Sequence, residues 1–191
     1  MGWRVNWYKA DKNEPLIITH HKDEKYGDDW DEVKINGECI CYNNGTEFWQ
    51  NLKYKNEDFK KEIKCLFDDP DCDYYSITKE GFKMIILEYR QRVIDYMKAS
   101  LDLYQHPEEK ESEKHWFTVD LIKEWEHEIS EWEHSYIGDN GETCYFNIAL
   151  HKPKGEFGIS SSWMYKFAIF DMIEIYKYFD WDNYTMVVYG G

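Results

Sequence analysis

Hydrophobic and polar residues alternate along the first part of the chain, a pattern that is typical of half-buried β-strands. Residues 3–8 follow this pattern, and the apolar residues of 16–20 predict a second strand after the polar segment at 11–15. Two strand-like segments joined by a turn rich in Asp, Asn and Pro predict a β-hairpin.

A second hairpin is predicted directly after the first. Asn36-Gly37 lies between two further strand-like segments, 33–35 and 38–42. An Asn-Gly pair accepts the positive φ angles that a type I′ turn requires, so we expect these two segments to pair with each other.

From residue 46 onward, apolar residues recur every three or four positions, as on one face of an α-helix. The spacing predicts a short helix near 48–52, a second one ending near Asp68, a long helix over 79–104 and another over 118–137. Thr78 is expected to cap the long helix, because its hydroxyl can accept a hydrogen bond from a backbone N–H of the first turn.

The C-terminal part predicts a strand at 144–150, a helix over 163–179 and a final strand at 186–189. Strands followed by helices and then by a strand–helix–strand unit predict the α+β class, with N-terminal antiparallel hairpins and central helices. We expect one compact domain, 1–191, because the length suits a single core. Its expected parts are β-rich, helical and strand–helix–strand: 1–45, 46–137 and 138–191.

A seven-residue near-repeat, Glu-Trp-Glu-His-Glu-Ile-Ser followed by Glu-Trp-Glu-His-Ser, occupies residues 124–135. On a helix with about 100° per residue, Trp125 and Trp132 fall on one side and a line of Glu and His on the other. The Trp side is better suited to burial, so we expect the Glu/His stripe to meet water. The stripe consists of Glu124, His127, Glu131 and His134, with Glu126, Glu128 and Glu133 on its flanks.

The stripe contains two E-x-x-H motifs, which ferritin-like di-metal proteins use as ligands. Those proteins carry the motifs on different helices, whereas both lie on one helix here, so a solvated acidic surface is the simpler interpretation. No cofactor is expected. The weak candidates for a surface metal site are Glu124, His127, Glu131 and His134.

A second acidic cluster precedes the long helix. The spacing of Asp69, Asp71, Asp73 and Glu80 matches the ligands of an EF-hand calcium loop. Tyr74 stands where that loop requires Gly, so we favour an acidic turn whose carboxylates lie near the positive end of the following helix dipole.

No motif predicts catalysis. G-x-S-x-G, P-loop and G-x-G-x-x-G patterns do not occur in the sequence. The serines at 160–162 are expected to cap a helix, and the sequence places no nucleophile beside His20, His21 or His151. We therefore do not expect an enzyme.

Charge narrows the possible partners. The net charge is −15, and only three of the 23 basic residues are Arg. Such a chain repels nucleic acid but attracts a basic protein surface. The nine Trp, 16 Tyr and 10 Phe exceed what one modest core usually holds, so some rings are expected at the surface as interface anchors.

The chain shows neither a secretory signal pattern at residues 1–7 nor an apolar run of about 18 residues, so we expect a cytoplasmic protein with no membrane contact. Its cysteines have the spacing of neither a disulfide framework nor a zinc site. We expect reduced, buried thiols that pack as small hydrophobic groups. These cysteines are Cys39, Cys41, Cys65, Cys72 and Cys144.

Together these features predict an acidic inhibitor that occludes a basic target, such as a nucleic-acid-binding protein or nucleoprotein. In size and charge the chain resembles phage anti-defence proteins (anti-CRISPR and anti-restriction proteins) and toxin-immunity proteins, although no motif carries that resemblance. Its carboxylates would replace nucleic-acid phosphates in pairing with Lys or Arg. The predicted contacts are Glu124, Glu126, Glu128, Glu131 and Glu133, with Asp68, Asp69, Asp71 and Asp73.

Two other functions remain open. The chain could be a metal-binding protein or metalloenzyme that uses the Glu/His stripe or the Asp-rich loop. It could also be a structural or assembly component. The sequence does not indicate an oligomeric state.

Overall fold

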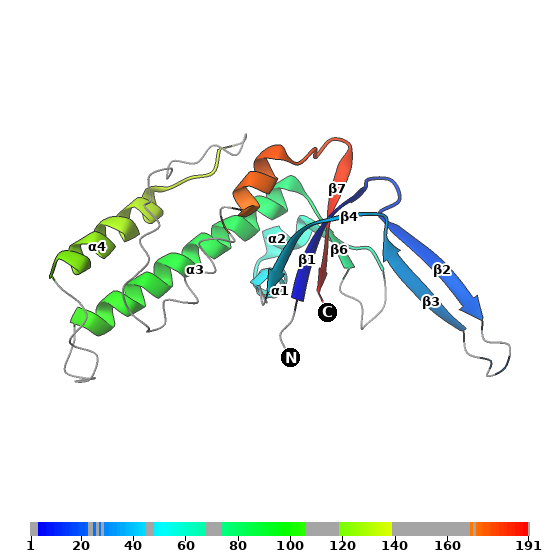
Figure 1. Cartoon of the computed structure of the whole chain (residues 1–191), viewed down its shortest axis with the longest axis horizontal. Coiled ribbons are helices and arrows are strands. Elements are labelled where there is room, and N and C mark those ends of the chain that lie inside the picture. Colours follow the sequence, from blue (N-terminus) through cyan, green and yellow to red (C-terminus); the bar gives the residue numbers. More distant parts are fainter. Residues whose placement is uncertain are drawn as a thin grey trace. The chain divides into compact units, whose positions relative to one another are not determined.

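The computed structural model describes residues 4–22, 25, 27, 29–44, 48–67, 74–105, 119–138, 169 and 171–190. The chain divides into a β-unit, residues 1–85 with 179–191, and a helical unit, residues 86–178. The fold is mixed α+β, with antiparallel strands at the N-terminus, helices in the middle of the chain and a strand at the C-terminus (Figure 1). The predicted fold class is confirmed, and the expectation of a single domain stays a prediction.

The β-unit is built on an antiparallel sheet with the strand order β4-β1-β7-β6-β5 in its described part. The C-terminal strand β7 lies between β1 and β6, so residues from both ends of the chain hydrogen-bond side by side. The strands are β1 (Arg4–Asp11), β4 (Gly37–Asn44), β5 (Ile63–Cys65), β6 (Tyr74–Ile77) and β7 (Tyr184–Gly190).

An aromatic core holds this unit together. Trp7 of β1 is buried and meets the ring of Phe82 edge-on, with 5.3 Å between ring centroids. Phe82 in turn lies 5.8 Å from the ring of Trp181, just before β7. Phe59 and Val188 are also fully buried. Residues from distant parts of the sequence therefore share one core.

The N-terminal strands do not pair as the two predicted hairpins. β2 (Leu16–Lys22) pairs with β3 (Asp29–Ile35), whereas β1 pairs with β4 and β7. The chain therefore forms one long antiparallel ribbon, in which β1 and β2 face β4 and β3. Its turn lies between β2 and β3, where Gly27 has a φ of +76°.

Asn36-Gly37 is not a hairpin turn, which corrects the second prediction. Gly37 pairs with Ala10 inside the sheet, and a Cβ on Gly37 would lie 2.2 Å from the carbonyl oxygen of Lys9. The close approach of the two strands, rather than a positive φ, requires glycine here.

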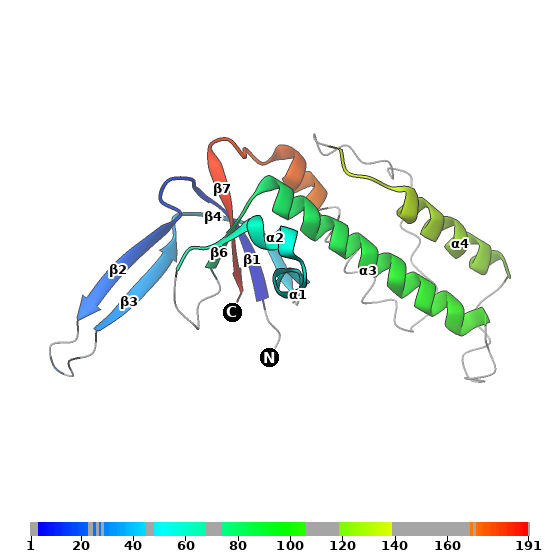
Figure 2. The ribbon, with the colours of Figure 1, turned by 180° about the vertical axis from the view of Figure 1, so that it is seen from behind.

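Asn36 links the two halves of the ribbon. Its N–H donates to the carbonyl of Pro15, its side-chain amide donates to that of Glu14, and its own carbonyl accepts from Asp11 N–H, each at 2.9 Å. These three hydrogen bonds hold both ends of the loop at 12–15 to Asn36. Beyond this point β2 and β3 form a separate two-stranded sheet, the β2–β3 arm, which extends away from the larger sheet (Figure 2).

The segment after β4 also differs from its prediction. Helices α1 (Phe48–Lys55) and α2 (Glu57–Lys61) are present, but the second ends well before Asp68, and β5 follows it. Asn56 caps α2 by accepting hydrogen bonds from two backbone N–H groups of the first turn. β5 and β6 are short strands that pair with each other, and the helical spacing of residues 59–67 concealed β5.

The helical unit is built on α4 (Val119–His134) and on α3 (Lys79–Gln105), which begins in the β-unit. The predicted cap of α3 is confirmed, since Thr78 Oγ1 accepts from Gly81 N–H at 3.1 Å. Residues 171–178 are helical as well, in agreement with the predicted helix. The predicted strand at 144–150 and the serines at 160–162 lie outside the described residues.

Candidate functional site

The outer surface of α4 carries the acidic residues that the near-repeat predicts. Trp125, Ile129 and Trp132 are buried, and Trp132 has no exposed surface. Glu124 and Glu126 are exposed, and Glu131 is half-buried. His127 and His134 are exposed too. The tryptophans of α4 are therefore buried and most of its charged side chains are exposed, as expected. We call Glu124, Glu126 and Glu131 the acidic face of α4.

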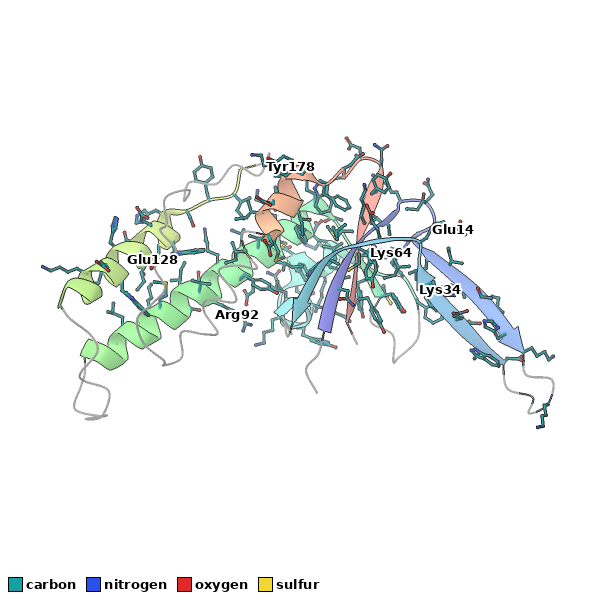
Figure 3. The ribbon with its side chains drawn as sticks, viewed as in Figure 1. Glu14, Lys34, Lys64, Arg92, Glu128 and Tyr178 are labelled. Carbon is teal, nitrogen blue, oxygen red and sulfur yellow. The ribbon has the colours of Figure 1, made fainter. Side chains whose placement is uncertain are left out.

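Glu128 does not belong to this face, which corrects its predicted position. Only 8% of Glu128 is exposed, and its carboxylate accepts a hydrogen bond from Trp132 Nε1 at 3.3 Å. Figure 3 labels Glu128 on α4. Glu128 lies one turn before Trp132, on the side of the helix that packs. Its carboxylate satisfies the indole N–H instead of facing a partner.

Glu133 is engaged by the neighbouring helix. Its carboxylate forms an ion pair with Lys98 of α3, and both side chains remain partly exposed. The hydrogen bond from the Lys98 ammonium, aided by the attraction between the two charges, holds the pKa of Glu133 below its usual range. A second contact joins the two helices: Arg90 of α3 donates a hydrogen bond to the carbonyl of Ser135, just after α4, at 2.5 Å.

The two E-x-x-H histidines make contacts within their own helix. His127 Nε2 lies 3.4 Å from Glu131 Oε1, and His134 Nδ1 lies 2.6 Å from the carbonyl oxygen of Ser130. Across the described ranges, no three His, Cys, Asp or Glu side chains come together as a metal-binding group. Of the weak metal candidates Glu124, His127, Glu131 and His134, no three are accordingly brought together as a metal site.

The Asp-rich segment with Asp68, Asp69, Asp71 and Asp73 lies outside the described residues. Its flanks are described, and they contradict an EF-hand. β5 precedes the segment and β6 follows it, and the two strands pair from Ile63 opposite Ile77 to Cys65 opposite Tyr75. An EF-hand requires a helix on each side of its loop. β6 also separates the aspartates from α3, so the turn does not lead directly into the helix as predicted.

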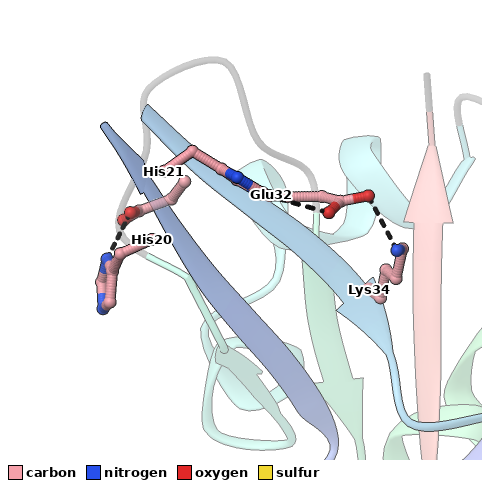
Figure 4. Close-up of polar contacts among 5 residues, drawn as sticks. His20, His21, Glu32 and Lys34 are labelled. Carbon is pink, nitrogen blue, oxygen red and sulfur yellow. Dashed lines mark hydrogen bonds and ion pairs between the residues drawn. The ribbon is translucent and has the colours of Figure 1, made fainter. Parts of the chain in front are cut away.

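The β2–β3 arm carries the two histidines that the sequence offered as possible bases (Figure 4). His20 Nδ1 lies 2.5 Å from Asp31 Oδ1, and His21 Nε2 lies 3.3 Å from Glu32 Oε2. Glu32 also accepts from Lys34 at 2.8 Å. The hydrogen bonds from Lys34 and then His21 lower the pKa of Glu32. Both histidines thus pair with carboxylates across the ribbon.

The arm also exposes large apolar side chains. The aromatic content predicts exposed rings, but it does not predict that they lie on this arm. Ile17, Ile18 and Trp30 are 45%, 40% and 52% exposed. Adjacent residues in a strand point to opposite faces, so Ile17 and Ile18 place one exposed apolar side chain on each face of the ribbon. An isolated two-stranded ribbon has no core of its own, so it cannot bury these side chains.

The cysteine prediction is wrong at two positions, because Cys39 and Cys65 are exposed. They lie on β4 and β5, the two outer strands in the order of the larger sheet. A side chain on an outer strand has a neighbouring strand on one side only, which reduces its burial. Within the described ranges, no helix has both the length and the apolar character needed to cross a membrane.

Comparisons with protein-family models, with curated proteins and with solved structures give no match to the chain. We therefore infer function from the residues and their geometry.

Proposed function

We propose that the protein binds a basic macromolecular target in the cytoplasm and inhibits it by covering its cationic surface. The observation that carries this proposal is the sorting of residues on α4. Its tryptophans are buried, while Glu124 and Glu126 are exposed and Glu131 is half-buried. Because the opposite side of the helix completes the packing, Glu124 and Glu131 can pair with a target without a change in the core.

The proposed mechanism is electrostatic. Carboxylates on the acidic face pair with Lys or Arg of the target in the positions that nucleic-acid phosphates would occupy. The net charge of −15 extends the attraction beyond the contact and raises the rate of association. A nucleic-acid-binding target has a surface of this kind, which is why we retain phage anti-defence and toxin-immunity proteins as the proposed classes. We propose Asp68, Asp69, Asp71 and Asp73 as a separate set of acidic contacts.

The proposal is tested by capturing partners from a lysate of the source cell and identifying them by mass spectrometry. A captured basic protein is then purified, and its binding is measured with the wild-type chain and with Glu124→Lys/Glu131→Lys. We expect the charge reversal to lower the association rate at low salt at least about tenfold, because it removes the steering charges.

A matched control reverses two other exposed carboxylates. Glu14→Lys/Glu38→Lys changes the net charge equally but lies in the β-unit, and both side chains are exposed. The control is expected to lower the association rate much less. An association rate that falls equally in both variants would mean that only total charge matters, and this result would contradict a role for the acidic face.

The β2–β3 arm is a second candidate contact for the same function. Its exposed Ile18 and Trp30 have the character of interface anchors, which act on dissociation rather than association. Trp30→Ala/Ile18→Ser is therefore expected to raise the dissociation rate of the captured target and leave its association rate nearly unchanged. An unchanged dissociation rate would contradict the proposal that the β2–β3 arm contacts the target.

A further inference from the structure

The β-unit contains a cleft of about 260 Å³ whose charge is opposite to that of the chain. Four lysines, Lys12, Lys61, Lys64 and Lys79, line it, with Glu62 as the acidic residue among the lining side chains. Random placement of residues in a chain of net charge −15 would favour an acidic lining. A local excess of ammonium groups attracts an anion.

The lysines come from three segments that the fold brings together. Lys12 follows β1, Lys61 and Lys64 lie at the end of α2 and in β5, and Lys79 is the first residue of α3. The backbone N–H groups at the start of this long helix add positive potential to that of the ammonium groups. Lys12 is held in place by Nζ bonds to the carbonyls of Trp181 and Asp182, at 3.0 and 2.9 Å.

Donors remain for a ligand. An ammonium has three N–H groups, so Lys12 retains one beyond its two carbonyl acceptors. The ammonium of Lys64 makes no ion pair with the described residues, and its side chain is exposed. Lys61 pairs with Asp58, whose carboxylate keeps the pKa of Lys61 above its usual range, so this lysine stays charged. Glu62 already accepts a hydrogen bond from the hydroxyl of Thr78.

The size and lining of the cleft indicate the class of ligand. Its volume is below the roughly 300 Å³ at which pockets for drug-sized molecules begin, so the ligand is small. Several separate ammonium groups suit a phosphate, because each of its terminal oxygens can accept from a different lysine. Trp181 and Tyr184 supply an aromatic wall beside the lysines, against which an attached organic group can lie.

We propose that this cleft binds a small phosphate monoester, with Lys12, Lys64 and Lys79 holding the phosphate. This site is independent of the acidic face and of the proposed inhibitory function. The phosphate is bound and not transferred, so no bond is made or broken.

Isothermal titration of the full chain at constant ionic strength tests the proposal with inorganic phosphate, adenosine monophosphate and adenosine. Both phosphate-bearing probes are expected to bind, the nucleotide more tightly because its organic part adds contacts, and adenosine is expected to bind at least about tenfold more weakly than the nucleotide. Adenosine that binds as tightly as the nucleotide would overturn the proposal, as would the absence of binding by either phosphate-bearing probe at millimolar concentrations.

Variants locate the site. Lys64→Gln/Lys79→Gln is expected to weaken binding of both phosphate-bearing probes at least about tenfold, because two charge-assisted hydrogen bonds are lost. The control Lys22→Gln/Lys55→Gln removes two exposed ammonium groups outside the cleft and is expected to leave affinity unchanged. Glu62→Gln removes the competing carboxylate and is expected to tighten binding, a result that misfolding cannot produce. Equal weakening in the cleft and control variants, or weaker binding by Glu62→Gln, would overturn the proposal.

Discussion

The acidic face of α4 and the basic cleft of the β-unit carry opposite charges and arise in different ways. The acidic face comes from one helix, where a near-repeat of seven residues places Glu124 and Glu131 on the same side. The cleft takes its lysines from three segments that meet only after the strands have paired. A charged surface on one element can thus be predicted from spacing, whereas a charged cleft between elements depends on the topology.

The largest effect is expected from removing the support behind the acidic face. Trp132 is fully buried, so Trp132→Ala should lower the free energy of unfolding by about 3–5 kcal/mol through lost burial and a residual cavity. Denaturant unfolding measures the change. Trp30→Ala on the arm removes the same side chain where it is half exposed, and about 0.5 kcal/mol or less is expected. Similar losses in the two variants would contradict the assigned burial.

A smaller effect is expected beside the cleft. Thr78→Ala removes the cap of α3 and should cost about 1 kcal/mol in the free energy of unfolding. Thr78→Ser keeps a hydroxyl that accepts from Gly81 N–H and should recover most of the loss. Chemical denaturation of the two variants checks this, and an equal loss in both would show that the methyl group rather than the cap matters.

Residues of the acidic face itself should hardly affect stability. Glu124→Lys/Glu131→Lys is expected to change the free energy of unfolding by about 0.5 kcal/mol or less, because neither side chain is buried. Thermal unfolding beside the binding assay checks this. A large loss of stability would show that Glu124 and Glu131 hold the fold, which would contradict their proposed role in binding a target.

The smallest effect concerns pH. The pKa of Glu133 is lower in the folded chain than its ordinary value because Lys98 donates to it, so the unfolded chain binds a proton more readily. The resulting stability is present above the ordinary pKa of about 4.3 and is lost as the pH falls through the lower folded value. Lys98→Met should therefore flatten the acid end of the stability curve. An unchanged acid slope would show that the pair does not form in solution.

The sequence predicted the elements better than their partners. α3, α4 and the strand regions of β1 and β7 follow from local spacing, and the α+β class follows from their order. The hairpin predictions failed because β1 finds its partners in β4 and β7, and β7 is the last strand of the chain. Pairing over such a separation leaves no local signal.

The site predictions divide in the same way. The helical spacing correctly predicted that Trp125 and Trp132 are buried, but it placed Glu128 on a flank. Glu128 is buried because the width of the buried side depends on what packs around the helix, which the spacing does not contain. The exposed apolar arm had a signal in the adjacent Ile17 and Ile18, which cannot both face one core from a strand. The lysine cleft had none, since no pattern within one element joins Lys12 to Lys64 and Lys79.

The most direct test of the proposed function is the association rate of the captured basic target, measured against salt concentration for the wild type and for Glu124→Lys/Glu131→Lys. Added salt screens charges, so the wild-type rate should fall as salt rises. The variant should associate at least about tenfold more slowly at low salt, and the two rates should converge at high salt. Equal rates at low salt, with the same dependence on salt, would contradict the claim that the acidic face guides and covers a basic target.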